Sequence, residues 1–489
     1  MRIIFPFILF VCLSMLSTSV KGQVNLSGST RSNNSFDRFR QEVNEDFNQF
    51  RAQANEEFER FLAEAWTEYQ CFIGESGMFA TPKPSQLVTP TTNAGKSLEA
   101  DPSFQTRTIP ETDRHHQVVP FPIEPGMTTI RFYGRELGFH LPESLRVTAK
   151  GTGEGDIAQY YKTMSSCLEG KRLHRELTLT AKCLGLNPWG YYLLLRTLAE
   201  KTFTDNNDRV LFCFYMLHSN GFLARVGRGR QSKQLILLLA IDNRKEVYSL
   251  PFFRINGVKY YAVYGGQKGE DAYSYHEKAD DDSLRQLGLD FKNAPCLSPC
   301  DKVRTMRLAQ TGIEIGVPFS TANLRYYDDI PLTVFPVYFK GGMGLETLQA
   351  FDSILTPLCS TNDKAQMVTL LLEFVQNAFA YKIDEEQFGH EKYFFPEEVI
   401  GYPYSDCEDR CALFANLVHR YTGCDIVGIL YPDHLATAVC LPDDVTLKGA
   451  SISHHGRSYI LCDPTFPGAA MGTVIPEYEN TPFDVVDIR

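Results

Sequence analysis

The sequence predicts an α+β protein that is divided into several units. Its 489 residues exceed a single ordinary core, because most domains contain about 100–200 residues. In the C-terminal part, apolar helix patterns at 364–380 and 407–421 precede a group of strand patterns, an order typical of helices packed on an antiparallel sheet. A comparable succession within residues 126–270 predicts a second α+β module. The C-terminal strand patterns cover 426–431, 435–441 and 458–462.

The first residues are typical of an export signal. Arg2 precedes an apolar stretch over 3–16, and a short polar segment follows it. We therefore expect a signal peptide over 1–22 and an exported protein, either periplasmic or secreted. The apolar stretch is short for a membrane span, which takes about 20 residues, and no later apolar stretch is longer. The sequence predicts no transmembrane segment.

Residues 33–72 carry an internal repeat that predicts a long amphipathic helix. Pairs of phenylalanines recur at a spacing of 11 residues, which corresponds to three turns at about 3.67 residues per turn. The opposite face is charged with both signs, which suits anionic lipid poorly. We expect the helix over 36–66 to pack on the protein or to self-associate, and attachment to an envelope partner is the alternative. The pairs are Phe36 with Phe39, Phe47 with Phe50, and Phe58 with Phe61.

Two segments lack regular periodicity. Residues 73–125 are rich in Pro, Thr and Ser, which predicts a flexible linker. Residues 271–344 are interpreted as an insertion or connecting segment, because much of their sequence is polar and poorly patterned. Within that segment, 331–340 alternates and contains two prolines, a combination that predicts an edge strand.

Charge and cysteine spacing argue against some classes of function. The formal net charge is −11, so the chain offers no broad basic surface for a phosphate backbone, and we expect no nucleic-acid partner. The 13 cysteines are irregularly spaced and include no Cys-x-x-Cys pair, which argues against a zinc site built from cysteines.

Cys407 lies where a helix is expected to begin, directly after Ser405 and Asp406, which are favourable N-cap residues. A helix N-terminus stabilises a thiolate and lowers the thiol pKa, and its free N–H groups can bind an oxyanion beside the sulfur. Glu408 and the aspartate after it oppose the thiolate, so a cationic partner is needed. Cys411, one turn later on the same face, is expected to belong to the core.

His434 is the candidate partner of Cys407. It stands at the mouth of the strand 435–441, where it can take the thiol proton and later deliver it to a leaving amine. Asp463 directly follows the strand 458–462, where it can fix the tautomer of the imidazole and stabilise its protonated form. The candidate catalytic residues are therefore Cys407, His434 and Asp463, each at the end of an element.

Three sequence blocks around these residues resemble a known family. The stretches 406–417, 431–439 and 459–469 read DCEDRCALFANL, YPDHLATAV and YILCDPTFPGA, and they are similar to the three motif blocks of transglutaminase-like proteins. The resemblance covers residues 345–489. It implies a papain-like α+β domain with a Cys-His-Asp triad, whose members occupy the three candidate positions.

The resemblance also implies a function. It indicates a cysteine peptidase or amidohydrolase that cleaves amide bonds of peptide or protein substrates through a thioester on Cys407. Ala436 stands where many relatives carry an aromatic residue, which resembles the bacterial branch, so hydrolysis is expected rather than crosslinking. No metal and no organic cofactor is implied. The alternative is a catalytically inactive envelope scaffold or binding protein that retains the triad residues by descent.

The module over 126–270 is interpreted as a degenerate copy of the catalytic domain, with an unrelated α+β domain as the alternative. Aligning Gly221 with Gly423 places Asp205 at the position of Cys407 and Ser232 at the position of His434. Such a copy lacks the triad.

Other polar residues have simpler interpretations. Gln376 could donate to an oxyanion, as papain-like folds suggest, but a solvated helix glutamine is the simpler interpretation. His454 and His455 lie in a polar loop, where exposed turn residues are the simpler interpretation and a metal site is the alternative.

Overall fold

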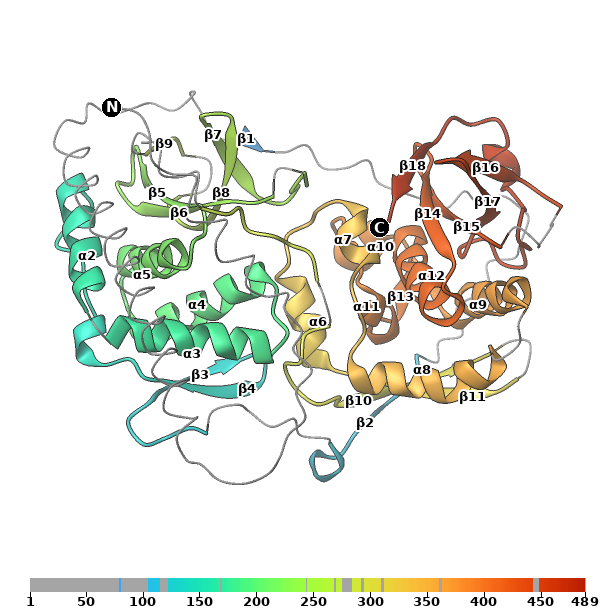
Figure 1. The fold of residues 1–489 in the computed structure, drawn as a ribbon, viewed down its shortest axis with the longest axis horizontal. Coiled ribbons are helices and arrows are strands. Elements are labelled where there is room, and N and C mark those ends of the chain that lie inside the picture. Colours follow the sequence, from blue (N-terminus) through green and yellow to red (C-terminus); the bar gives the residue numbers. More distant parts are fainter. Residues whose placement is uncertain are drawn as a thin grey trace, which may run out of the picture. The chain divides into compact units, whose positions relative to one another are not determined.

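The computed structural model describes most of the chain after residue 103 (Figure 1). The predicted signal peptide over 1–22 and repeat helix over 33–72 lie outside the described residues. Two pieces of the predicted linker, β1 (Phe79–Ala80) and β2 (Thr106–Thr108), pair with strands of the body. Among the described residues, no helix has the length and apolar character of a membrane span. The described residues are 79–80, 104–114, 122–167, 169–242, 244–267, 270–274, 284–291, 294–308, 312–359, 363–442 and 448–488.

The middle module combines helices with an antiparallel sheet, as the sequence predicts. The strands follow the order β1-β7-β8-β6-β5-β9, and β6 is buried along its whole length because α5 packs against it. A separate hairpin joins β3 (Thr128–Phe132) and β4 (Arg135–Phe139). The helices are α2 (Glu154–Ser166), α3 (Glu169–Cys183), α4 (Pro188–Thr202) and α5 (Asn206–Ser219). The strands are β5 (Ala224–Gly229), β6 (Leu235–Ala240), β7 (Pro251–Ile255), β8 (Val258–Gly265) and β9 (Ala272–Tyr273).

The connecting segment contains more regular structure than its polar sequence predicts. β10 (Lys302–Arg307) pairs with β11 (Glu314–Phe319) and with β2, and α6 (Thr321–Asp328) follows. The predicted edge strand over 331–340 is wrong, because the structure places α7 (Phe335–Phe339) there. Proline is tolerated in the first turn of a helix, and Val337, Tyr338 and Phe339 are buried in succession rather than in alternation.

The C-terminal part consists of a helical layer and a five-stranded antiparallel sheet. The strand order is β16-β17-β15-β14-β18, so the last strand in sequence pairs with the first. The short strands β12 (Ala380–Tyr381) and β13 (Tyr404–Ser405) pair in parallel before the main helix. The helices are α8 (Leu345–Leu358), α9 (Lys364–Ala378), α10 (Asp384–Phe388), α11 (Pro396–Gly401) and α12 (Cys407–Thr422). The strands are β14 (Asp425–Leu430), β15 (Leu435–Cys440), β16 (Ser451–His454), β17 (Arg457–Cys462) and β18 (Asp484–Asp487).

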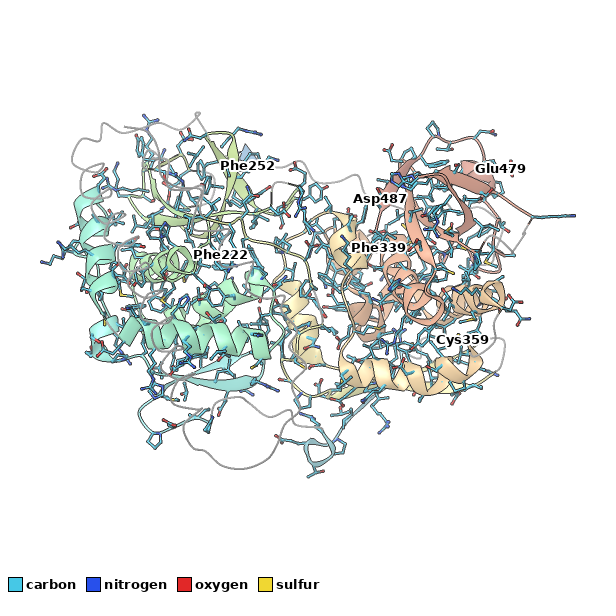
Figure 2. All side chains as sticks on the ribbon, viewed as in Figure 1. Phe222, Phe252, Phe339, Cys359, Glu479 and Asp487 are labelled. Carbon is cyan, nitrogen blue, oxygen red and sulfur yellow. The ribbon has the colours of Figure 1, made fainter. Side chains whose placement is uncertain are left out.

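The helix α12 and the strand β15 form the centre of this part. Asp406 is the N-cap of α12, and Gly423 ends the helix with a φ of 65°, a conformation that favours glycine. One face of β15 packs on α9 and α12 in a core that includes Phe339, labelled in Figure 2, and the other face packs on residues after β17. Since both faces are covered, any side chain at the start of β15 is enclosed.

The sheets of the middle module and the C-terminal part share one strand order. In each, a helix (α5 or α12) directly precedes the strands, and the strand that follows that helix has the corresponding neighbours: β7-β8-β6-β5-β9 matches β16-β17-β15-β14-β18. The degenerate copy predicted for 126–270 requires such an agreement and stays a prediction, with an unrelated α+β domain as the alternative. Five residues lie between β5 and β6, and four lie between β14 and β15. When the two sheets are aligned at the starts of β6 and β15, Gln234 rather than Ser232 is equivalent to His434.

Glu397 joins the C-terminal part to the connecting segment. The carboxylate accepts hydrogen bonds from the backbone N–H groups of Ser320 (3.3 Å) and Gly344 (3.2 Å) and from the amide of Asn323. The side chain is fully buried, and burial raises the pKa of Glu397 to about 7 despite these donors.

The raised pKa of Glu397 predicts a loss of stability with rising pH. The folded state favours the protonated carboxyl, so its contribution to the free energy of unfolding falls as pH rises from about 4.5 to about 7 and then levels off, by about 3 kcal/mol in all. Urea unfolding across this range should show the decline, and Glu397→Gln should reduce its slope, while the part due to Glu398, whose pKa burial also raises to about 7, remains. An identical pH slope in both proteins would contradict the assignment.

Candidate active site

The three predicted residues occupy the element ends that the sequence indicates. Cys407 is the first residue of α12, His434 directly precedes β15, and Asp463 directly follows β17. The neighbours β15 and β17 are antiparallel, with Thr437 opposite Cys462, so the start of one lies beside the end of the other.

His434 and Asp463 form a buried pair. The Nε2 atom of His434 lies 2.8 Å from Oδ2 of Asp463, while Oδ1 of Asp463 accepts the backbone N–H of Thr465 at 2.8 Å. With Nε2 held by the carboxylate, Nδ1 is the nitrogen that remains for proton transfer. This Nδ1 is buried and has no hydrogen-bond partner among the described residues.

Among the described residues, the Cys407 thiol is hydrogen-bonded to a residue outside this pair. One turn along α12, the Sγ atom of Cys411 donates to the backbone oxygen of Leu435 at 3.2 Å, so the start of the helix lies against the start of β15. Cys407 itself donates from Sγ to Oε2 of Glu408 at 3.0 Å rather than to His434. The structure therefore brings His434 and Asp463 into contact and leaves Cys407 bonded to its own neighbour.

Burial controls the protonation of Cys407. The side chain is fully buried, and this burial raises the pKa of the thiol well above its usual range, an effect to which the charges of Glu408 and Asp406 add. The lowered pKa predicted from the helix start is therefore wrong for this state, because desolvation and the two carboxylates outweigh the helix dipole. Cys407 is a neutral thiol in this conformation.

An aromatic cover that sequence reasoning missed encloses the imidazole. The ring of Tyr478 stacks on His434 at a centroid distance of 5.3 Å and an angle of 9°, and Tyr431 stacks on Tyr478 at 4.5 Å and on His434 at 6.3 Å. The hydroxyl of Tyr478 donates to Oδ1 of Asp433 at 2.8 Å. Tyr478 lies in the short 3-10 helix η4 (Pro476–Tyr478), 44 residues after His434, and no local pattern marks it. The cover leaves His434 with no exposed surface.

Gln376 positions the segment that carries Asp463. The prediction of a solvated glutamine is wrong, since the side chain is 1% exposed. Its Nε2 donates to the backbone oxygens of Asp463 (2.9 Å) and Ala469 (3.0 Å). The side chain thus holds the turn after β17, while its buried Oε1 has no hydrogen-bond partner within the described part of the chain.

A cluster of buried carboxylates adjoins Cys407. Burial raises the pKa of Asp384 to about 9 and those of Asp406, Glu408 and Asp409 well above their usual range, and each carboxylate raises the pKa of its neighbours. With Glu391, they form two groups of three carboxylates, in each of which one oxygen from every carboxylate lies within 4.8 Å of the other two. Oxygen-only ligand sets suit hard cations such as Ca²⁺, so these carboxylates could hold either protons or such a cation.

A groove of about 790 Å³ reaches the aromatic cover. Its walls include Tyr431 and Pro432, which precede His434, and Phe483, Tyr248 and Phe335 from other segments. The groove is mostly apolar, and its volume lies within the range of ligand pockets. Because Tyr431 lines the groove and also contacts Tyr478, a ligand in the groove lies against the cover of the imidazole.

Comparisons with protein-family models, with curated proteins and with solved structures find no match for this chain. The chemistry of the site therefore rests on its own residues.

Proposed function

We propose that the protein is a cysteine hydrolase that cleaves amide or peptide bonds through a thioester on Cys407, with a transglutaminase-like, papain-like catalytic domain over 345–489. The observation that carries the proposal is the His434–Asp463 pair at 2.8 Å, which leaves a buried Nδ1 with no partner among the described residues, next to a strand start that Cys411 of α12 contacts. A histidine held in this way is a general base that lacks only its proton donor.

The reaction follows from the roles of these groups. Nδ1 of His434 takes the thiol proton while the sulfur attacks the carbonyl carbon of the substrate, and Asp463 stabilises the imidazolium that results. The free N–H groups of the first turn of α12 bind the oxyanion. The imidazolium then protonates the leaving amine as the C–N bond breaks, and water hydrolyses the thioester by the same proton transfers in reverse.

Catalysis in this form requires the site to open. Substrate reaches Cys407 only when Tyr478 leaves the face of His434, and the groove beside Tyr431 is the route that we assign to a peptide chain. The same proposal includes export of the protein and an extracytoplasmic peptide or protein substrate. It also includes self-association or an envelope contact through 36–66.

One observation favours a second candidate, a catalytically inactive scaffold or binding protein. Cys407 is fully buried and its pKa is raised, as for a thiol that serves only packing. The two candidates differ in whether the thiol becomes reactive when a substrate-like molecule binds.

Labelling with a peptide-based electrophile distinguishes the two candidates. A library of peptidyl acyloxymethyl ketones is added to the full chain, and the modified cysteines are identified by mass spectrometry. The hydrolase should be labelled at Cys407 by a subset of peptides, and His434→Ala should lose that label while Cys411→Ala keeps it. Labelling confined to the exposed Cys183, with none at Cys407 for any peptide, would support the scaffold.

Removing the aromatic cover should expose the nucleophile. Tyr478→Ala deletes the ring that stacks on His434, and we expect alkylation of Cys407 by iodoacetamide to accelerate about 3- to 10-fold, because a stacked aromatic pair contributes about 0.5–1.5 kcal/mol. Peptide mapping after timed quenching measures the rate. Tyr478→Phe keeps the ring and loses only the bond to Asp433, so its rate should stay close to that of the wild type. A Tyr478→Ala rate equal to the wild-type rate would show that another segment closes the site.

A further inference from the structure

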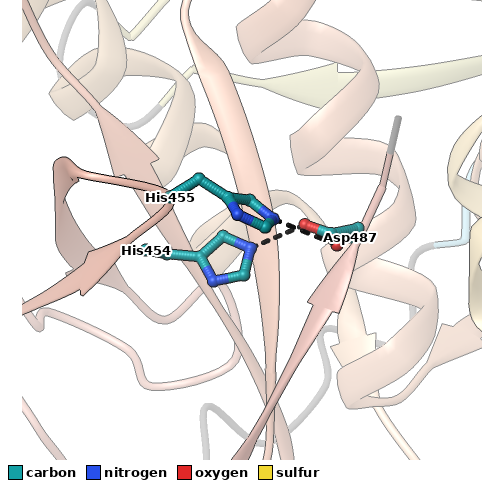
Figure 3. Close-up of side chains that lie close together, drawn as sticks. All are labelled: His454, His455 and Asp487. Atoms are coloured by element: carbon teal, nitrogen blue, oxygen red, sulfur yellow. Dashed lines mark hydrogen bonds and ion pairs between the residues drawn. The ribbon is translucent and has the colours of Figure 1, made fainter.

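Two histidines and an aspartate meet at one end of the C-terminal sheet (Figure 3). Nε2 of His454 lies 2.7 Å from Oδ1 of Asp487, and Nε2 of His455 lies 3.7 Å from Oδ2 of the same carboxylate. The two imidazole rings are 4.0 Å apart between centroids. All three side chains thus present their ligating atoms to one point, and these atoms lie within 4.8 Å of one another.

We propose that His454, His455 and Asp487 bind a transition-metal ion of the Zn²⁺ type, which joins the two edges of the C-terminal sheet. The site is separate from the candidate active site and does not depend on the proposed hydrolase function.

The backbone brings the two histidines to the same side. Adjacent residues of a strand normally point to opposite faces. His455, however, has a φ of 50° and Gly456 a φ of 75°, as in the two-residue turn that joins His454 to its partner Arg457. Asparagine or glycine is the usual residue at the first of these turn positions. Here a histidine takes it, and its ring lies beside that of His454.

The third ligand comes from the far edge of the sheet. β16 and β18 are the two outer strands in the order β16-β17-β15-β14-β18, yet the side chains at their ends are in contact. The sheet is therefore curled. An ion pair between Arg457 of β17 and Asp425 of β14 crosses the same end of the sheet. A metal ion bound to His454, His455 and Asp487 would close this curl between the outer strands.

The ligand set indicates the class of metal. Two imidazole nitrogens and one carboxylate are ligands for Zn²⁺, Cu²⁺ or Ni²⁺, whereas hard cations prefer oxygen alone. Ligands on a tetrahedral ion at about 2.0–2.1 Å are about 3.3 Å apart, so His454 and Asp487 need to separate by roughly half an ångström. Asp487 and His455 have exposed fractions of 56% and 73%, which permits this movement and leaves the fourth position to water.

Metal binding would also affect the groove. β18 contributes Asp484, Val485 and Val486 to its wall, and Asp487 is the next residue. An ion at Asp487 therefore anchors the strand that forms one side of the groove, and we expect it to raise the stability of the sheet by binding only the folded state.

The test uses the untagged full chain, stripped with a chelator and dialysed, with exposed thiols alkylated so that sulfur ligands do not compete. Titration with Zn²⁺ against a chromophoric chelator should reveal a site that His455→Asn and Asp487→Asn each weaken by at least about tenfold. Asparagine tolerates the positive φ at 455, so the turn is kept. His390→Asn, at another surface histidine, is the control and should bind as the wild type does.

Two further measurements separate this site from the buried carboxylate cluster. Cu²⁺ in the wild type should give an electron paramagnetic resonance spectrum with coupling to imidazole nitrogen, which an oxygen-only site cannot produce. Zn²⁺ should also raise the melting temperature of the wild type and of His390→Asn but not of Asp487→Asn. Equal Zn²⁺ affinity in the wild type, His455→Asn and Asp487→Asn, or a copper spectrum without nitrogen coupling, would overturn the proposal.

Discussion

Cys407→Ala is expected to abolish amide hydrolysis, with a fall in kcat of about 10⁴-fold or more, because no other group can form the thioester. Replacement of His434 by Ala or of Asp463 by Asn should lower kcat by a comparable factor of about 10⁴, since triad members act as a unit. The measurement is the steady-state cleavage of a fluorogenic peptide that is chosen from the library labelling experiment.

Cys411→Ala is the matched control for this prediction. Cys411 lies on the same helix, is equally buried and also has a raised pKa, so its replacement disturbs packing to a similar degree. It should retain most of the activity if Cys407 is the nucleophile. Equal activity of Cys407→Ala and the wild type would rule out the thioester mechanism, and loss of activity in Cys411→Ala alone would move the nucleophile one turn along α12.

Arg410→Met is expected to destabilise the protein by about 3–5 kcal/mol, since it removes one partner from a buried charge network. Arg410 is fully buried in α12. It donates from Nη2 to the backbone oxygen of Phe379 at 2.6 Å and from Nε to Oγ of Ser405 at 3.3 Å. The charges of Asp406, Asp409 and Asp463 act on its guanidinium, while burial lowers its pKa to about 10. Without Arg410, the buried oxygens of Phe379 and Ser405 lose their donor, and any of these carboxylates that is ionised loses a buried positive charge.

Arg420 on the same helix provides the control. Its guanidinium pairs with Asp352 at the surface, where both side chains are more than a third exposed, and exposed pairs contribute about 0–1 kcal/mol. Urea unfolding followed by circular dichroism should therefore separate a large midpoint shift for Arg410→Met from a small one for Arg420→Met. Similar shifts for the two variants would show that protons or a bound cation, rather than Arg410, compensate the carboxylate cluster.

Local sequence patterns predicted the elements that carry the candidate site. The helix that begins at Cys407 was predictable from its N-cap residues and from Gly423 at its end, and the strands that flank His434 and Asp463 from short apolar runs. The pairing of β15 with β17 then brings the start of one strand beside the end of the other, so the contact between His434 and Asp463 follows from simple antiparallel topology.

Other features depend on residues that are distant in sequence, and local patterns did not reveal them. The helix α7 replaces a predicted strand, because three consecutive side chains find buried positions there. The sequence around Gln376 is typical of a surface position. In the structure, the turn after β17 packs over α9, and its backbone oxygens accept hydrogen bonds from the Gln376 amide. Asp487 and the pair His454–His455 meet only because the sheet curls.

The sequence by itself therefore determined the chemical types and positions of the candidate catalytic groups, since these depend on short segments that form one helix start and two strand ends. Only the tertiary structure decided the protonation of Cys407 and the accessibility of His434. The thiol of Cys407 is neutral because burial removes water from it and places Glu408 against it. The ring of Tyr478, which lies 44 residues later in the sequence, covers the imidazole of His434. Desolvation and long-range packing depend on the arrangement of the whole fold, and no local pattern encodes them.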